Sequence, residues 1–227
     1  SPRWSVRLED VDSSLAEGSI RGPVTLDQGV AVLGVLKSIK ERRLLSFHAI
    51  GLDMHSGSLL WSRPLASAGT LPYGANAKIA DIPAVADGLI FQMDALGFAS
   101  AVEAVTGRVQ WLRRMPLQNI IAAGRRTWEG SSVVAREGVV YFIAPDRRTV
   151  VSIDAETGDI LTQRSSADFR DPEYLVRAGD HLIAVAEDRV IAIPFDLFDD
   201  QGTAPAVILD ARDASIEGRI AVAGNRV

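Results

Sequence analysis

A ten-residue pattern recurs three times at nearly constant spacing, and this repeat constrains the fold more than any other feature of the chain. The copies occupy residues 52–61, 102–111 and 153–162. Each copy has an apolar residue, an acid, two variable residues, a Ser or Thr and a glycine, and the first two copies end on tryptophan. The repeated glycines are Gly57, Gly107 and Gly158, which are 50 and 51 positions apart. Repeats of this length indicate a fold built from identical supersecondary units, as in a β-propeller.

Each copy has the composition of a β-hairpin. The acid and the hydroxyl side chain can accept hydrogen bonds from turn amides, and glycine supplies the positive φ of a tight turn. The repeated acids are Asp53, Glu103 and Asp154. Trp61 and Trp111 stand four residues after their glycines, so we expect both indoles to pack between neighbouring sheets and bury a large apolar area. Thr162 takes this position in the third copy, where we expect a weaker contact.

A second repeated element precedes each hairpin. It is a turn residue with glycine followed by a run rich in β-branched and aromatic residues, with another short strand before it. The turns are Gln28-Gly29, Asp87-Gly88, Glu137-Gly138 and, in degenerate form, Gly179-Asp180. Each repeat therefore holds four short antiparallel strands, and the fold class we expect is an all-β propeller with about four blades. The expected units are residues 20–69, 70–119, 120–167 and 168–212.

The two ends of the sequence look like incomplete repeats. Residues 1–19 contain Arg3-Trp4-Ser5-Val6, which is similar to the last strand of a preceding blade. Residues 213–227 resemble the opening strands of a following blade. We therefore expect a segment of a larger ring, with a self-closed ring of four blades as the structural alternative.

Composition excludes several classes of function. The formal net charge is −5 and the pI is about 5.3, so the overall field disfavours nucleic acid as a partner. The absence of cysteine removes disulfides, thiolate metal sites and cysteine nucleophiles. No apolar run reaches the ~18 residues of a transmembrane helix. Any association with a membrane would therefore depend on a partner or on a lipid anchor outside this sequence.

The repeated pattern resembles the PQQ-like repeat, whose consensus is close to apolar-Asp-x-x-Thr-Gly-x-x-x-Trp. This family includes quinoprotein alcohol dehydrogenases and a propeller lipoprotein of the BAM complex. The resemblance covers most of the chain and implies a propeller in the periplasm or cell envelope of a bacterium. The repeat is a structural signature and does not by itself imply that PQQ is bound.

We expect no catalytic, cofactor-binding or metal-binding residue in this chain. A PQQ dehydrogenase needs a carboxylate-rich calcium site, and the family's alcohol dehydrogenases stack PQQ on a vicinal disulfide that this sequence cannot form. The repeated acids are explained by turn hydrogen bonds. The acidic run at 196–202 lacks the alternating spacing of a calcium loop, and His48, His55 and His181 show no paired spacing. The alternative is a fragment of a PQQ- and calcium-dependent dehydrogenase whose site is completed by missing blades.

Two long loops are candidates for binding a protein partner. The first, residues 67–78, contains Tyr73 in a glycine-rich stretch. The second, residues 113–130, is rich in the residue types favoured at interface hot spots, namely Arg113, Arg114, Arg125, Arg126 and Trp128. The structural alternative is that the arginines keep this loop soluble while Trp128 folds onto the core. We therefore expect a protein-binding or scaffolding module, and a purely architectural repeat remains a third hypothesis.

Overall fold

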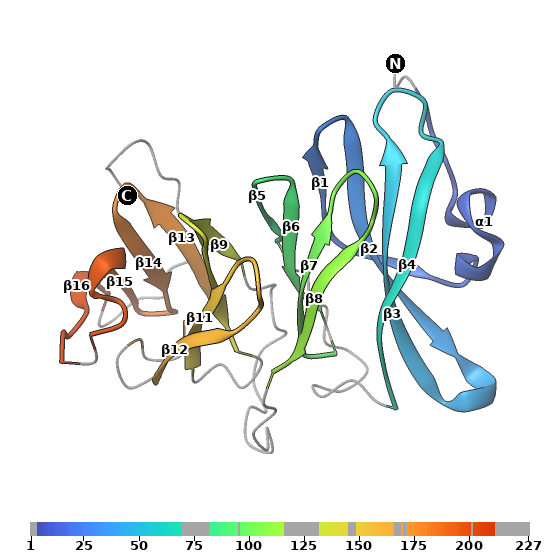
Figure 1. Cartoon of the computed structure of the whole chain (residues 1–227). Helices are drawn as coiled ribbons and strands as arrows, with labels where there is room; N and C mark the ends of the chain where they lie inside the picture. Colours follow the sequence, from blue (N-terminus) through green and yellow to red (C-terminus); the bar gives the residue numbers. More distant parts are fainter. Residues whose placement is uncertain are drawn as a thin grey trace.

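Four four-stranded antiparallel sheets make up most of the described part of the chain (Figure 1), which confirms the expected all-β propeller architecture. The structure is a computed structural model that describes residues 4–69, 82–94, 96–115, 132–144, 149–165, 169, 172–200 and 202–211. The sheets follow one another in chain order and form an open array that fits part of a ring. The first and fourth sheets lie at opposite ends of this array, so the alternative of a self-closed four-blade ring is not seen.

Each sheet is one blade, and its strands pair in simple sequence order. The first blade contains β1 (Ser19–Asp27), β2 (Val30–Ile39), β3 (Leu44–Asp53) and β4 (Leu59–Ala68). The second contains β5 (Ala84–Ala86), β6 (Leu89–Met93), β7 (Phe98–Glu103) and β8 (Val109–Arg114). The third contains β9 (Val134–Arg136), β10 (Val139–Ile143), β11 (Thr149–Asp154) and β12 (Ile160–Ser165). The fourth contains β13 (Tyr174–Ala178), β14 (His181–Val185), β15 (Arg189–Pro194) and β16 (Ala206–Asp210).

The helical content is limited to short turns among the described residues. These are α1 (Leu8–Val11), η1 (Ser13–Leu15), η2 (Lys40–Arg42) and η3 (Phe195–Leu197).

The first two strands of blades one to three are joined by the same tight turn. Both central residues have positive φ in each case: 47° and 80° at Gln28 and Gly29, with similar values at Asp87-Gly88 and Glu137-Gly138. This geometry matches a type I′ turn, whose twist suits that of the paired strands. The glycine carbonyl of each turn accepts a hydrogen bond from the repeat hairpin of the same blade, as in Met54 N–H to Gly29 O at 2.9 Å. The two repeated elements are therefore tied together at one end of each blade.

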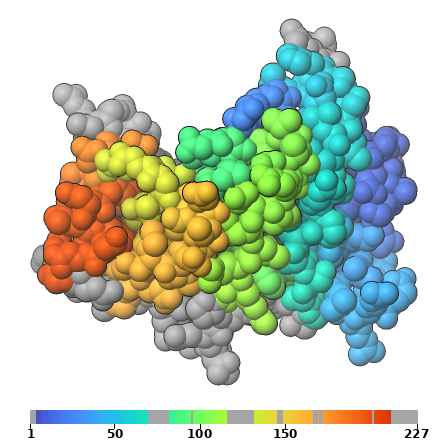
Figure 2. Space-filling view, viewed as in Figure 1, coloured from blue at the N-terminus to red at the C-terminus, as the bar shows by residue number. Residues whose placement is uncertain are grey.

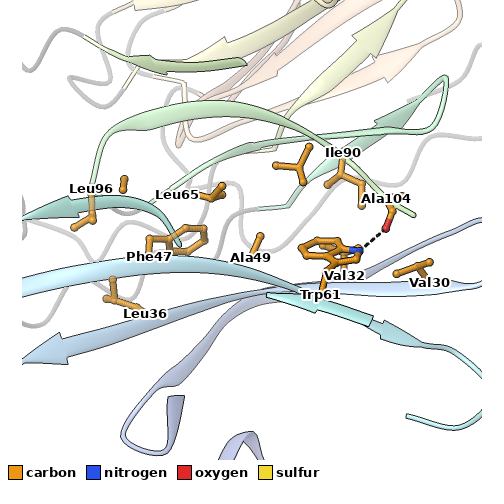
Figure 3. Close-up of a cluster of buried hydrophobic side chains, with 12 residues drawn as sticks. Val30, Val32, Leu36, Phe47, Ala49, Trp61, Leu65, Ile90, Leu96 and Ala104 are labelled. Atoms are coloured by element: carbon orange, nitrogen blue, oxygen red, sulfur yellow. Dashed lines mark hydrogen bonds between the residues drawn. The ribbon is translucent and has the colours of Figure 1, made fainter. Parts of the chain in front are cut away.

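The hydrophobic core is divided into layers between successive blades. Between the first and second blades, Phe47 and Trp61 pack with Ile90 and Leu96 (Figure 3). The next layers are built in the same way, with Phe91, Trp111 and Phe142 between blades two and three, and Tyr141, Phe195 and Phe198 between blades three and four. Alternate residues of each central strand point to opposite faces, so a blade contributes to both neighbouring layers. Its central strands are therefore buried on both sides.

The face of the first blade that points away from the second blade is covered by the N-terminal segment. Leu15 is fully buried there against Leu33, Val35 and Ile50, and α1 packs beside it. Residues 4–18 contain no strand. Their apolar side chains instead follow the short turns of α1 and η1. The expected following blade, residues 213–227, lies outside the described residues.

Candidate interaction face

The tryptophans of the repeat join one blade to the next. The Trp61 ring lies between Gly51 of its own blade and Gly107 of the second, and a Cβ atom on these glycines would lie 2.3 and 2.4 Å from the ring. Its Nε1–H donates to the carbonyl of Ala104 at 2.9 Å (Figure 3). Gly107 has φ +67°, which L side chains rarely adopt. Glycine is therefore required at this position both for the turn and for the close approach of the indole.

The same contact is made at two further blades. Trp111 lies against Gly158 of the third blade and donates to the carbonyl of Ala155 at 2.8 Å. Trp4, which precedes the first blade, lies against Gly57 and donates to the carbonyl of Met54 at 2.9 Å. In each case the acceptor stands three residues before the repeat glycine. The repeat residues therefore serve the stacking of blades.

The repeated acids are engaged by their own turns. Asp53 Oδ1 accepts from Ser56 Oγ at 2.8 Å and from the amides of His55 and Ser56, and these bonds hold the pKa of its carboxyl below the usual value. Asp154 accepts from the amides of Glu156 and Thr157 at 3.0 and 2.7 Å.

Glu103 is longer by one methylene group and uses different partners. Its carboxylate accepts from Arg108 and from Thr106 Oγ1, and the Arg108 bond is the larger cause of its lowered pKa. All three acids therefore stabilise hairpins, and the structure does not bring them together into a shared carboxylate site.

An arginine two residues after each tryptophan position also bridges blades, and the sequence analysis missed this regularity. Arg63 Nε donates to the carbonyl of Gly107 at 3.2 Å. Arg113 pairs with Asp159 of the third blade at 2.8 Å. Arg164, two residues after Thr162, is 1% exposed and reaches into the fourth blade. The constant two-residue offset is visible in the sequence and could have revealed these contacts.

Arg164 replaces the missing tryptophan between the third and fourth blades. Its guanidinium donates to the carbonyls of Leu197, Phe198, Asp200 and Thr203 at 2.5–3.4 Å. It also lies 5.8 Å from the centre of the Phe198 ring. A buried, charge-assisted set of hydrogen bonds therefore takes the place of a buried indole.

The hydrogen bonds of Arg164 also involve the acidic loop at 196–202. Three carbonyl oxygens of this loop, those of Leu197, Phe198 and Asp200, accept hydrogen bonds from Arg164. The carboxylate of Asp200 is hydrogen-bonded to Gly202 N–H and Thr203 Oγ1 at 2.9 and 2.7 Å. Within the described ranges, no group of three or more His, Cys, Asp or Glu residues is placed to hold a metal ion.

The sheets have two chemically different ends. Alternate connections of an antiparallel sheet lie at opposite ends. The turn end carries the type I′ turns and the repeat hairpins. The loop end carries the β2–β3 hairpin, its counterparts in later blades and the links between blades. Among the described residues, acids are more numerous at the turn end, which carries Asp27, Asp53, Asp87, Glu103, Glu137, Asp154, Glu156, Asp159, Asp180, Asp196, Asp199 and Asp200.

Among the described residues, the β2–β3 hairpin of the first blade is the longest projection at the loop end. Its strands have ten residues each, against five or six in the corresponding strands of the other blades. Its tip, residues 37–43, carries Lys37, Lys40, Arg42 and Arg43 against a single acid, Glu41. A basic projection therefore stands at the end of the sheets opposite the acidic turns.

The predicted partner-binding residues have three different outcomes. Arg113 is half-buried and forms an ion pair with Asp159, so it joins the second blade to the third. Arg114, the last residue of β8, is exposed at the loop end. Tyr73, Arg125, Arg126 and Trp128 lie outside the described residues.

Asp94 is a buried acid at the loop end of the second blade. Its Oδ1 accepts from the amides of Leu96 and Phe98 at 2.8 and 2.9 Å, which closes the β6–β7 turn. Burial nevertheless raises the pKa of this carboxyl to about 7. Because the folded chain then holds the proton more tightly than the unfolded chain, stability is greatest below the unfolded pKa near 4 and is lost as pH rises through 7.

We expect Asp94→Asn to flatten this pH dependence. The amide oxygen can keep the two turn hydrogen bonds but cannot ionise, whereas wild type should lose up to about 4 kcal/mol between pH 4 and pH 8. Urea unfolding at pH 4.5, 6 and 8, followed by far-UV circular dichroism, measures the slope of the unfolding free energy against pH in wild type and in the variant. The lowered pKa values of Asp53 and Asp154 affect the free energy of unfolding only at pH values below this range, where the stabilisation by these carboxylates is lost as pH falls. Equal slopes in wild type and variant would contradict the expectation.

Comparison with known proteins identifies related sequences and folds. The family model described as outer membrane protein assembly factor BamB matches residues 3–193. The crystal structure of BamB from Moraxella catarrhalis is similar with a TM-score of 0.52 at 18% identity, over 89% of this chain and 67% of that one. A search of curated proteins found no match.

Two other solved structures show the same fold at lower identity. The computationally designed Ika4 protein has a TM-score of 0.50 at 14% identity, over 78% of this chain and 92% of its own. The quinohemoprotein alcohol dehydrogenase from Comamonas testosteroni has a TM-score of 0.51 at 11% identity, over 79% of this chain and 34% of its own. Both scaffold-type and catalytic proteins therefore share this architecture, and the fold alone does not select an activity.

Proposed function

Because this chain belongs to the PQQ-like propeller family described as outer membrane protein assembly factor BamB, we propose that it is a non-catalytic module that binds another protein in the bacterial cell envelope. The description of the matching family supports the envelope location. No helix in the described part of the chain is long and apolar enough to cross a membrane.

The observation that carries this proposal is the use of the repeat acids. Asp53, Glu103 and Asp154 are each bonded within their own hairpins, and Asp94 is buried in a turn. A metal-dependent dehydrogenase needs several carboxylates converging on one ion. The acids of the described blades stabilise the scaffold instead, which supports a binding role over a catalytic one.

The loop end is the surface we propose for the partner. Loops held by a rigid scaffold are the usual carriers of binding function. The basic hairpin tip and Arg114 stand at this end, and the second candidate loop begins there. The turn end is less suited because the acid side chains of its repeat hairpins are engaged in local hydrogen bonds.

Site-specific photo-crosslinking of the full-length protein in its native bacterium tests the binding function. A photoreactive residue at Arg114 or Glu187, both at the loop end, should crosslink to one defined envelope protein. The same residue at Gln28 or His55, at the turn end, provides the matched control and should not. Crosslinks from the turn end alone, or none from either end, would count against the proposal.

Addition of PQQ with calcium tests the dehydrogenase alternative. A ligand that binds the native state raises the melting temperature. We expect no shift at a PQQ concentration of 100 µM with 1 mM calcium, both on the order of conditions that would saturate a micromolar site. A concentration-dependent rise, absent with calcium alone, would favour the dehydrogenase hypothesis.

A further inference from the structure

We propose that the tip of the first-blade hairpin, residues 37–43, binds an acidic segment of the protein partner. This inference rests on the proposed function, because it specifies the chemistry by which the loop end recognises its partner. It depends on three features of the tip: its projection, its uncompensated charge and the backbone conformation of Arg43.

The hairpin extends well beyond the other blades. β3 begins four residues earlier than β7 when the two are aligned at Asp53 and Glu103. At about 3.3 Å per residue this places the tip about 13 Å farther out. The hairpin is the projection at the lower right of Figure 1 and of Figure 2. A partner approaching the loop end can therefore contact the tip before it reaches the second blade.

The cations of the tip divide into two pairs with different roles. Lys37 donates to the carbonyl of Ser14, and Lys40 pairs with Glu17 at 3.1 Å, so both hold the N-terminal segment against the first blade. Arg42 and Arg43 are exposed, and their guanidinium groups make no hydrogen bond or ion pair with the described residues. Two adjacent guanidinium groups are thus available at the outermost point of the hairpin.

The backbone at Arg43 is unfavourable for a side chain as large as arginine. Arg43 ends η2 with φ +50° and ψ +41°, in the left-handed region, where its amide donates to the carbonyl of Lys40 at 3.2 Å. Glycine and asparagine adopt this conformation at lower cost. An arginine without a local partner in a position that suits glycine is consistent with a role in binding rather than in folding.

A carboxylate-bearing protein segment fits this tip better than a membrane. Arginine binds carboxylates through two parallel hydrogen bonds, and arginine is enriched at interface hot spots. Anionic membranes attract each basic residue by only about 1 kcal/mol, so stable binding takes a larger cluster of basic residues. The tip has two cations without a partner among the described residues, and its apolar residue Ile39 is half-buried, as are Leu44 and Leu45 just after it. The charge pattern therefore favours a short acidic sequence.

Fluorescence anisotropy with a labelled ten-residue Asp/Glu-rich peptide tests the proposal on the whole chain. The double variant Arg42→Gln/Arg43→Gly should weaken binding at least tenfold at low salt and should reduce its salt dependence. Arg43→Gly alone should weaken binding while the melting temperature stays equal or rises, which a merely structural role would not produce. Arg7→Gln removes one positive charge, as Arg43→Gly does, from an exposed site outside the tip and should change affinity less than twofold.

Three outcomes would overturn the proposal. The first is equal peptide affinity in wild type and the double variant. The second is no binding of the peptide by wild type. The third is binding of wild type to vesicles containing 30% phosphatidylglycerol without binding to the peptide, which would assign the tip to a membrane. Crosslinking from Arg114 and Glu187 tests the proposed function separately. If the peptide experiment contradicts binding at the tip but these crosslinks form, the proposed function still holds.

Discussion

Replacing Trp61 with alanine should lower the free energy of unfolding by about 3–5 kcal/mol, as expected for truncating a large buried aromatic side chain. The indole is 5% exposed and fills the space between Gly51 and Gly107, so its removal leaves a cavity between two blades. The Nε1–H bond to Ala104 is lost as well. Urea unfolding followed by far-UV circular dichroism measures the loss without relying on tryptophan emission.

Three variants separate the contributions to this contact. Trp61→Phe keeps an aromatic ring but removes the donor and part of the volume, so an intermediate loss is expected. Leu60→Ala, at the exposed neighbouring position, should cost less than about 1 kcal/mol. Gly107→Ala should destabilise from the opposite side, since its Cβ would overlap the indole and φ +67° is unfavourable for alanine. A small loss for Trp61→Ala would mean that the blades are joined mainly by other contacts.

Replacing Arg164 with methionine should cost about 3–5 kcal/mol, because each buried carbonyl left without a donor costs about 1–3 kcal/mol. Methionine keeps much of the volume but has no donors, so the carbonyls of Leu197, Phe198, Asp200 and Thr203 lose their shared partner in a buried layer. Because the contact joins the third and fourth blades, loosening should begin there. Hydrogen exchange should therefore increase first in β13 to β16.

Arg113→Met is the matched control for Arg164→Met. Arg113 occupies the same position in the second blade, but its ion pair with Asp159 is solvent-exposed, and exposed pairs contribute about 0–1 kcal/mol. The two substitutions remove the same side chain from equivalent positions and differ in burial. Equal losses would contradict the assignment of Arg164 as the buried substitute for tryptophan.

The repeat in the sequence predicted the architecture because its residues act locally. The acid, the hydroxyl and the glycine form a hairpin within one blade, and a tryptophan four residues later must find a partner outside its own strand pair. Three copies at constant spacing therefore imply stacked sheets. The Gln28-Gly29 turn and its counterparts were recognised for the same reason, since short turns restrict residue type strongly.

The candidate site was predictable only in part. Arg113 and Arg114 were singled out as partner-binding residues from composition, yet Arg113 bridges two blades while Arg114 is exposed. The difference lies in the position of Asp159, 46 residues later in the chain. The basic hairpin tip was not recognised, because its significance comes from strand length and from the contacts of Lys37 and Lys40 with the N-terminal segment.

The sequence alone determined that the chain forms four-stranded blades and that tryptophans join them, because both follow from spacing and from turn chemistry within about ten residues. Only the tertiary structure decided which charges remain free. Arg164 is buried among carbonyls of the fourth blade, Lys40 meets Glu17, and Arg42 and Arg43 project without a described partner. Charge compensation depends on which distant residues the packing brings within a few ångströms, and no local pattern encodes that distance.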